Sequence, residues 1–225
     1  SNKGNNKLRY EILVRQFSAE GSQIYPSRFL PALERYNLAA KLDQWVINAT
    51  FSFLQNHADK IDDIEYLSIN LSGQSLSNKK IHDLIIWFFD LQLLPSSKIV
   101  FEITETVAIA NLTEATHFIN SLKQYGCRFA LDDFGSGMSS FAYLKKLPVD
   151  YLKIDGLLVK DIVEDPIDYA MVKSINEVGQ LMGLETIAEF VENDAILQKL
   201  KDINVDCAQG YGMGRPQALK DLFKA

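Results

Sequence analysis

Segments with the pattern of β-strands alternate with segments of helical periodicity along most of this chain. The predicted strands cover residues 9–15, 66–71, 98–104, 128–132, 151–154 and 185–189, with a short strand around Cys207. The predicted helices cover residues 26–53, 81–91, 112–125, 141–147, 166–182, 194–203 and 217–223. This alternation predicts an α/β fold with a parallel sheet covered by helices, and about eight strand–helix units favour a (β/α)8 barrel of the TIM type. A doubly wound open sheet is the alternative, although no Gly-x-Gly-x-x-Gly motif follows the first strand, which weakens a dinucleotide-binding interpretation.

Most of the predicted strands carry a polar residue, usually an acid, at or just beyond the C-terminal end. A strand that is buried on both faces is expected to be a nearly continuous apolar run. One acid at a strand end is usually a helix cap, but here the pattern recurs at strand after strand. In a barrel the C-terminal ends meet at one mouth, where active sites lie. The polar residues are Asn70, Glu102, Glu105, Asp132, Asp133, Lys153, Asp155, Glu189, Glu192 and Gln209.

The chemistry of these side chains predicts a metal site. Converging carboxylates repel one another and resist desolvation unless a cation holds them. The candidate ligands are carboxylate and amide oxygens without His or Cys, which favours Mg²⁺ or Mn²⁺ over Zn²⁺. The adjacent pair Asp132 and Asp133 is suited to bridging two ions, the arrangement used for in-line displacement at phosphorus.

The acids Asp132 and Asp133 are followed by Phe134, and Gly135 and Gly137 then let the backbone turn sharply. Asp-Phe-Gly also occurs in protein kinases, but the glycine-rich loop and the His-Arg-Asp loop of kinases are absent from this sequence. An ordinary glycine turn is the structural alternative for this stretch alone.

Lys153 lies inside an apolar strand segment, where a lysine is rare unless it is paired. A salt bridge with a carboxylate is the structural hypothesis. The functional hypothesis is a lysine whose pKa is lowered by nearby metal ions and which positions or deprotonates a water molecule. The residues alone leave both hypotheses open.

Composition excludes several classes of protein. The net charge of -6 disfavours the phosphate backbone of a nucleic-acid polymer as the main partner, although a bound metal can still allow a small phosphorylated ligand. The two cysteines, Cys127 and Cys207, lack metal-site spacing and are too few for a disulfide framework. The sequence contains no apolar run of transmembrane length, so we expect no direct membrane contact by this domain.

Seven short motifs occur in order along the chain. They are Glu11-Ile-Leu-Val-Arg15, Ser68-Ile-Asn70-Leu-Ser72, Phe101-Glu102-Ile-Thr104-Glu105, Asp132-Asp133-Phe-Gly-Ser-Gly, the run from Leu144 to Asp155, Ala188-Glu189-Phe-Val-Glu192, and the run from Gln209 to Pro216. With these motifs the chain resembles, from Leu8 to its C-terminus, the EAL domain, the cyclic di-GMP phosphodiesterase module of bacterial signalling proteins. The resemblance implies a modified (β/α)8 barrel of the TIM type whose first strand is antiparallel to the others.

The resemblance also implies roles for individual residues. Two ions, Mg²⁺ or Mn²⁺, would be held by metal ligands. The implied catalytic residues are Lys153, which would act on the attacking water, and Glu189, which would help to hold the second ion through water. Glu105 would brace the loop that contains Ser136, which in this family couples dimerisation to metal binding. The implied metal ligands are Glu11, Asn70, Glu102, Asp132 and Asp133. The implied substrate-binding residues are Leu13, Arg15, Asp43, Glu192 and Gln209.

The chain departs from the family pattern at four positions. Ile12 replaces the usual Ala, Ser136 the usual Thr, Met138 the usual Tyr, and Phe190 the usual Gly after Glu189. None of these changes removes an implied metal ligand or the lysine, so we expect a metal-dependent enzyme that hydrolyses cyclic di-GMP to linear pGpG. A cyclic di-GMP receptor that binds without turnover is the first alternative. Another metal-dependent barrel enzyme, acting on a small carboxylate or enol, is the second.

The expected organisation has two parts. Residues 1–7 are expected to be a disordered expression scar or linker, and residues 8–225 the phosphodiesterase domain, as a fragment of a longer multidomain protein. The expected partners are a second copy in a homodimer and an upstream sensor or GGDEF-type domain. The expected location is cytoplasmic, which also suits a full-length protein anchored in a membrane.

Overall fold

The computed structural model describes residues 7–135, 137 and 141–223. The described residues fall into two compact units. The N-terminal unit comprises residues 7–101, 120–127 and 218–223, and the C-terminal unit comprises the described residues of 102–119 and 128–217. Residues 1–6 of the expected linker, and Ser136, lie outside the described residues.

Seven strands form one sheet in the order β1-β4-β5-β6-β7-β8-β9. Their bounds are β1 Leu8–Ile12, β4 Ile64–Asn70, β5 Ile99–Thr104, β6 Arg128–Phe134, β7 Tyr151–Ile154, β8 Glu185–Ala188 and β9 Cys207–Ala208. The pairings β1–β4, β6–β7, β7–β8 and β8–β9 are parallel, which confirms the predicted α/β class. Parallel pairing brings the C-terminal ends of two paired strands to the same edge of the sheet.

The expected antiparallel first strand is wrong for this chain. β1 pairs with β4 in parallel, with Glu11 opposite Ser68 and Ile12 opposite Ile69. This direction lets Asn70, at the end of β4, donate a hydrogen bond to Glu11. An antiparallel ladder occurs instead between β2 (Gln16–Phe17) and β3 (Gln23–Ile24), a short hairpin that the alternation pattern did not predict.

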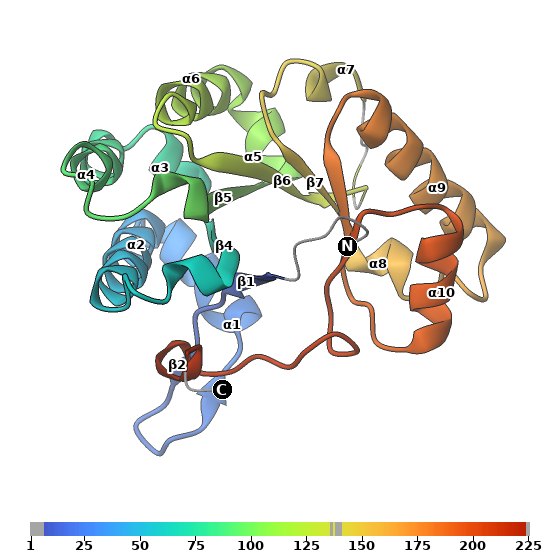
Figure 1. Ribbon diagram of the computed structural model, residues 1–225, viewed down its shortest axis with the longest axis horizontal. Helices are drawn as coiled ribbons and strands as arrows, with labels where there is room; N and C mark the ends of the chain where they lie inside the picture. The colour runs from blue at the N-terminus through green and yellow to red at the C-terminus, as the bar shows by residue number, and fades with distance from the viewer. Residues whose placement is uncertain (1–6, 136, 138–140, 224–225) are drawn as a thin grey trace. The chain divides into compact units, whose positions relative to one another are not determined.

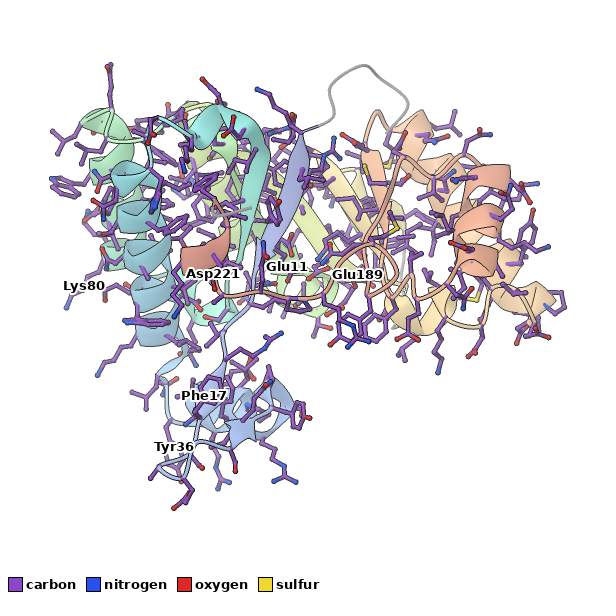
Figure 2. All side chains as sticks on the ribbon, turned by 60° about the horizontal axis from the view of Figure 1, so that its bottom comes forward. Glu11, Phe17, Tyr36, Lys80, Glu189 and Asp221 are labelled. Carbon is purple, nitrogen blue, oxygen red and sulfur yellow. The ribbon has the colours of Figure 1, made fainter. Side chains whose placement is uncertain are left out.

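In the N-terminal unit, helices flank β4 and a small lobe extends from them. The helices are α1 Pro26–Arg35, α2 Ala39–Asn56, α3 Gly73–Leu76, α4 Lys79–Asp90 and the 3-10 helices η1 Ile61–Asp63, η2 Ser96–Lys98 and η3 Leu219–Asp221. Figure 1 shows α2 next to α4 and β4, and the apolar faces of α2 and α4 are buried there. Figure 2 shows Phe17 and Tyr36 on the lobe that β2, β3 and α1 form.

In the C-terminal unit, helices alternate with β6 to β9. They are α5 Glu105–Ala110, α7 Phe141–Leu144, α8 Gly156–Val159, α9 Pro166–Leu181 and α10 Asp194–Asp202, while α6 Leu112–Lys123 continues into the N-terminal unit. α9 packs on β7 and β8 (Figure 1). Its Gly179 lies so close to the sheet that an added Cβ would be 2.9 Å from Thr186 Cγ2.

Two predicted helices differ from the observed elements. The predicted helix over 26–53 is two helices, because Asn37, with φ of 55°, takes the left-handed conformation between α1 and α2. The predicted helix over 217–223 is only the 3-10 turn η3. None of the helices in the described part of the chain is both long enough and apolar enough to cross a membrane.

Candidate active site

Lys153 in β7 is the centre of a buried ion cluster in the C-terminal unit. Its side chain is 1% exposed, and Nζ donates to Glu102 Oε2 at 2.7 Å. Nζ also lies 2.9 Å from Asp132 Oδ1 and 2.8 Å from Glu189 Oε1. The three carboxylates come from the ends of β5, β6 and β8, so parallel strands bring together residues far apart in sequence. The predicted convergence of strand-end acids therefore holds within this unit.

A bulge in β6 explains how two consecutive acids reach one cluster. Neighbouring residues of a regular strand point to opposite faces of the sheet. The ladder pairs Leu131 with Leu152 and Phe134 with Ile154, so that Asp132 and Asp133 together face the single residue Lys153. Asp133 adopts φ of 54°, a left-handed conformation that aspartate tolerates better than most residues. The bulge turns both carboxylates toward the same place.

The acids of this unit fit a divalent cation. Asp132, Asp133 and Glu189 each offer an oxygen, and these atoms lie within 4.8 Å of one another. Among the described residues, Asp132 Oδ1 is buried without a hydrogen bond, and its 2.9 Å approach to Lys153 is outside hydrogen-bonding geometry. Three carboxylates around one ammonium leave these four side chains with an excess of negative charge. Lys153 compensates only part of this charge, and burying the remainder is costly unless a further cation compensates it.

Two further predicted metal ligands lie in the N-terminal unit. Glu11 ends β1 and Asn70 ends β4, and Asn70 Nδ2 donates to Glu11 Oε1 at 2.7 Å. The amide oxygen of Asn70 points in a different direction from its donating nitrogen, so it can still serve as a hard-oxygen ligand. Glu11 and Asn70 therefore offer oxygen ligands for a metal, as the acids around Lys153 do in the other unit.

The carboxylate of Asp43, which was predicted to bind substrate, is held by hydrogen bonds within the N-terminal unit. It lies buried in α2, and its Oδ2 accepts hydrogen bonds from Ser72 N at 2.8 Å, Ser72 Oγ at 2.6 Å and Ser75 Oγ at 2.6 Å. Burial is the largest influence and raises the pKa of Asp43, against the opposing effect of the serine hydrogen bonds. Asp43 therefore holds Ser72, the N-cap residue of α3, which is two residues after Asn70.

The other predicted substrate-binding residues occupy strand ends and loops. Leu13 is exposed just after β1, and Arg15, half-buried, donates from Nη1 to Val14 O at 3.1 Å. Glu192 is exposed in the turn before α10. Gln209 follows β9, and its backbone N–H donates to Ala188 O at 2.8 Å, which fixes it beside the end of β8.

Glu105 anchors the chain that follows Phe134. It is buried at the start of α5, and its Oε2 accepts from Gly135 N–H at 3.1 Å, while its Oε1 accepts from the hydroxyl of Tyr143. Burial first, and then the hydrogen bond and charge of Glu105, raise the pKa of Tyr143, which keeps this hydroxyl a donor. Gly135 has φ of 102°, and an added Cβ would lie 2.7 Å from Leu158 Cδ1. No motif or residue spacing had pointed to Tyr143 as a hydrogen-bond donor to Glu105.

Phe190, which replaces the usual glycine, stands out by its backbone. Its φ is 53°, in the left-handed region that glycine adopts freely and a bulky aromatic residue adopts rarely, at a cost of about 1–3 kcal/mol. The side chain is nevertheless 59% exposed, so burial of the ring offsets little of that cost. The departure was visible in the sequence, but its conformational cost was not.

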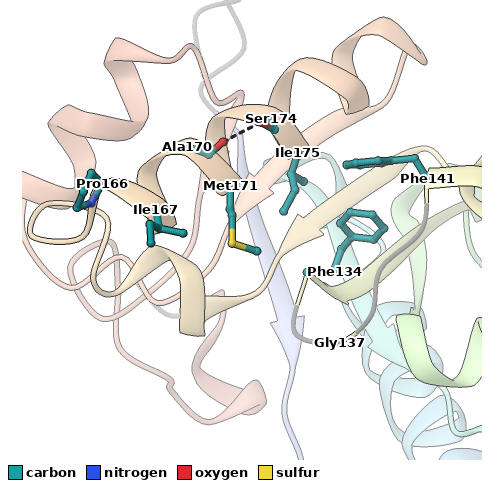
Figure 3. Close-up of a pocket in the computed structure, with 10 residues that line it drawn as sticks. Phe134, Gly137, Phe141, Pro166, Ile167, Ala170, Met171, Ser174 and Ile175 are labelled. Atoms are coloured by element: carbon teal, nitrogen blue, oxygen red, sulfur yellow. Dashed lines mark hydrogen bonds between the residues drawn. The ribbon is translucent and has the colours of Figure 1, made fainter.

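The C-terminal unit also contains an apolar pocket of about 480 Å³. It lies between the end of β6 and the start of α9, and Figure 3 shows Phe134, Phe141, Met171 and Ile175 around it. None of the described residues that line it has a titratable side chain. The described lining of this pocket is therefore apolar, in contrast to the charged surroundings of Lys153.

Comparisons with known proteins identify relatives of this chain. The EAL domain family profile matches residues 1–216. The cyclic di-GMP phosphodiesterase PdeB of Shewanella oneidensis is 43% identical over 213 residues, which is 95% of this chain and 25% of that protein. The cyclic di-GMP phosphodiesterase PdeF of Escherichia coli is 33% identical over 95% of this chain and 28% of that protein. The chain thus spans about a quarter of the length of these curated relatives.

Solved structures have the same fold. The PaMucR phosphodiesterase in complex with c-di-GMP superposes with a TM-score of 0.87, at 28% identity, over 95% of this chain and 86% of that one. The FimX EAL domain from Pseudomonas aeruginosa, bound to c-di-GMP, gives a TM-score of 0.85 at 28% identity, over 96% and 87% of the two chains. These similarities confirm the predicted barrel-like α/β class, since EAL domains have a TIM-barrel-like fold.

Proposed function

This chain belongs to the EAL domain family, and on that premise we propose that it hydrolyses cyclic di-GMP to linear pGpG in a metal-dependent reaction. The observation that carries the proposal is the buried Lys153 with Glu102, Asp132 and Glu189 around its ammonium group. A receptor that only binds the nucleotide has no chemical need for a buried lysine among acids. A hydrolase needs both, to hold metal and to orient water.

Different residues of this chain would have different roles in the hydrolysis. Asp132, Asp133 and Glu189, with Glu102 nearby, would hold divalent ions, and Glu11 and Asn70 are the further metal ligands that the family resemblance implies. Bound Mg²⁺ or Mn²⁺ would supply a Lewis acid for the phosphate oxygens and lower the pKa of water. Lys153 would orient the attacking water through its ammonium group. The water oxygen forms a bond to phosphorus as one P–O ester bond breaks. The attacking water gives up one proton, and the departing oxygen takes up one proton.

Charge supports the same assignment. Cyclic di-GMP carries two phosphodiester charges, which the acids around Lys153 would repel by themselves. Divalent ions would reverse the sign of the local field and attract the phosphates. We place Arg15 at a phosphate, with Leu13, Asp43, Glu192 and Gln209 at the rest of the nucleotide. The three hydrogen bonds that Asp43 accepts would have to loosen for it to contact a guanine base.

A hydrolysis assay tests the proposal. The purified chain is incubated with cyclic di-GMP and Mg²⁺ or Mn²⁺, and the products are separated by chromatography. We expect linear pGpG, its loss in thorough chelator, and its loss in Asp132→Asn. Asp161→Asn, a change of an exposed acid on the loop after α8, is the matched control and should convert the substrate normally. Binding without product would favour the receptor alternative, and no binding would favour another barrel enzyme.

Finer points of the proposal rest on the resemblance. They are two ions per site, a homodimer, an upstream sensor or GGDEF-type domain in a longer protein, and a cytoplasmic location. The relatives named above, about four times longer than their matched segments, support the placement of this domain in a larger protein. Equilibrium sedimentation with and without Mg²⁺ tests the homodimer.

A further inference from the structure

The ring of Phe190 is placed by the two strands that carry the central residues of the ion cluster. Phe190 directly follows Glu189, whose Oε1 lies 2.8 Å from Lys153 Nζ. The ring also rests on Gly156, three residues after Lys153. An added Cβ on Gly156 would lie 2.0 Å from Phe190 Cδ2 and 2.4 Å from its Cγ, so the ring occupies the space that any other side chain at this position would need. The ring therefore lies at the C-terminal ends of β7 and β8.

The neighbouring turn carries a second exposed ring. Gly212 N–H donates to Val191 O at 2.9 Å, and an added Cβ on Gly210 would lie 2.4 Å from Val191 N, so the turn packs closely on the segment after Phe190. Tyr211 in this turn is 58% exposed, and the guanidinium of Arg215 lies 5.3 Å from the centre of its ring. Exposed aromatic rings with a cation beside them are typical of sites that bind nucleotide bases.

Neither conformation nor burial accounts for an aromatic residue at position 190. The left-handed backbone favours glycine, and the ring is left largely in solvent. A strained residue next to a chemical site is a reason to look for a ligand. We propose that Phe190 is a specificity-determining residue whose exposed ring face stacks on one purine base of the cyclic dinucleotide. This inference rests on the proposed function and names a base contact of that same site.

The residues around Phe190 favour a nucleotide base, rather than a protein partner, as the group that stacks on its exposed ring face. The ring lies next to the acids that would hold the metal ions at the phosphodiester. In a dinucleotide, each base lies within a few bonds of a phosphate. Gly156 supports the ring from beneath, which holds it in place before the ligand arrives. A preorganised ring loses little conformational freedom on stacking.

The test compares four variants in steady-state hydrolysis of cyclic di-GMP. Phe190→Gly removes both the ring and the strain, and Phe190→Leu removes the ring but keeps apolar bulk. Phe190→Tyr keeps the ring. Leu181→Ala is the matched control. Leu181 is 87% exposed at the end of α9, shortly before the N-terminal end of β8, whereas Phe190 follows the C-terminal end of that strand.

We expect KM to rise about 5- to 150-fold in Phe190→Gly and Phe190→Leu, the fold-change for one base on one aromatic ring, while kcat changes far less. Phe190→Tyr and Leu181→Ala should stay within about twofold of the unchanged chain in KM. The melting temperature of Phe190→Gly should equal or exceed that of the unchanged chain, which separates a lost contact from a damaged fold.

Other outcomes overturn the inference in distinguishable ways. If the unchanged chain converts cyclic di-GMP and Phe190→Gly has the same KM, the stacking role is wrong and the proposed function stands. The same conclusion follows if Phe190→Gly alters only the oligomeric state, which would make the ring a protein contact. If the unchanged chain neither binds nor converts the nucleotide, the proposed function fails and the inference fails with it.

Discussion

Replacing Lys153 with methionine separates its electrostatic role from its packing role. Methionine keeps an unbranched apolar stem but removes the ammonium that lies within 2.9 Å of Glu102, Asp132 and Glu189. Removing one partner of a buried ion pair costs about 3–5 kcal/mol, because charge is left buried and uncompensated. For a chain of this length, that loss lowers the melting temperature by about 6–20 °C.

Metal should change this result. In chelator, the acids around position 153 face one another without a compensating charge, so the full loss is expected. With Mg²⁺ bound, the ions would compensate the same acids, and the variant should recover much of its stability. The turnover number should still fall about 10²–10⁴-fold, because water orientation is lost.

The assay is thermal unfolding of Lys153→Met and the unchanged chain, each in chelator and in Mg²⁺, together with kcat on the same preparations. Lys173→Met is the matched control. Lys173 is 50% exposed and 3.9 Å from Glu177, a surface pair worth about 0–1 kcal/mol. The reasoning is refuted if Lys153→Met unfolds within about 2 °C of the unchanged chain in chelator. It is also refuted if Mg²⁺ stabilises both proteins equally.

Three further predictions concern the other acids. Glu11→Gln should weaken the Mg²⁺ dependence of hydrolysis and lower kcat at least tenfold without unfolding the domain, and an unchanged metal titration would contradict its assignment as a ligand. Glu105→Ala leaves the hydroxyl of Tyr143 and the N–H of Gly135 without their acceptor, so we expect unfolding in urea to show a loss of about 1–3 kcal/mol and a weaker response to metal. The raised pKa of Asp43 means that the folded chain binds this proton more tightly than the unfolded chain, whose value is near 3.8. The contribution of Asp43 to stability is therefore greatest below that value and falls as pH rises through the raised pKa. Asp43→Asn should flatten this part of the pH dependence in urea unfolding between pH 4 and 7, and identical slopes would refute it.

The alternating pattern of the sequence was enough to predict the α/β class and the position of most strands. Burial on both faces makes a parallel strand apolar throughout, so a polar residue at its end is conspicuous without any structure. Glu102, Asp132, Lys153 and Glu189 were found in this way, and their oxygen-rich chemistry predicted the kind of metal. Local patterns in the sequence were therefore enough to select the candidate site residues.

Contacts between distant residues were decided only by the tertiary structure. The direction of β1 depends on its pairing with β4, and the break at Asn37 depends on a backbone conformation that periodicity does not report. The bulge turns Asp132 and Asp133 to one place. It appears only in the pairing with β7, where two residues of β6 lie opposite one residue of β7.

The surroundings of individual side chains were also decided only by the tertiary structure. Asp43 has the same sequence neighbours whether it binds substrate or holds α3, and only Ser72 and Ser75, about thirty residues away, show which hydrogen bonds it makes. The strain at Phe190 and the space that Gly156 leaves for its ring are likewise set by two strand ends meeting. Sequence patterns report local preference, whereas hydrogen bonds, bulges and ring contacts depend on which distant segments the fold brings together.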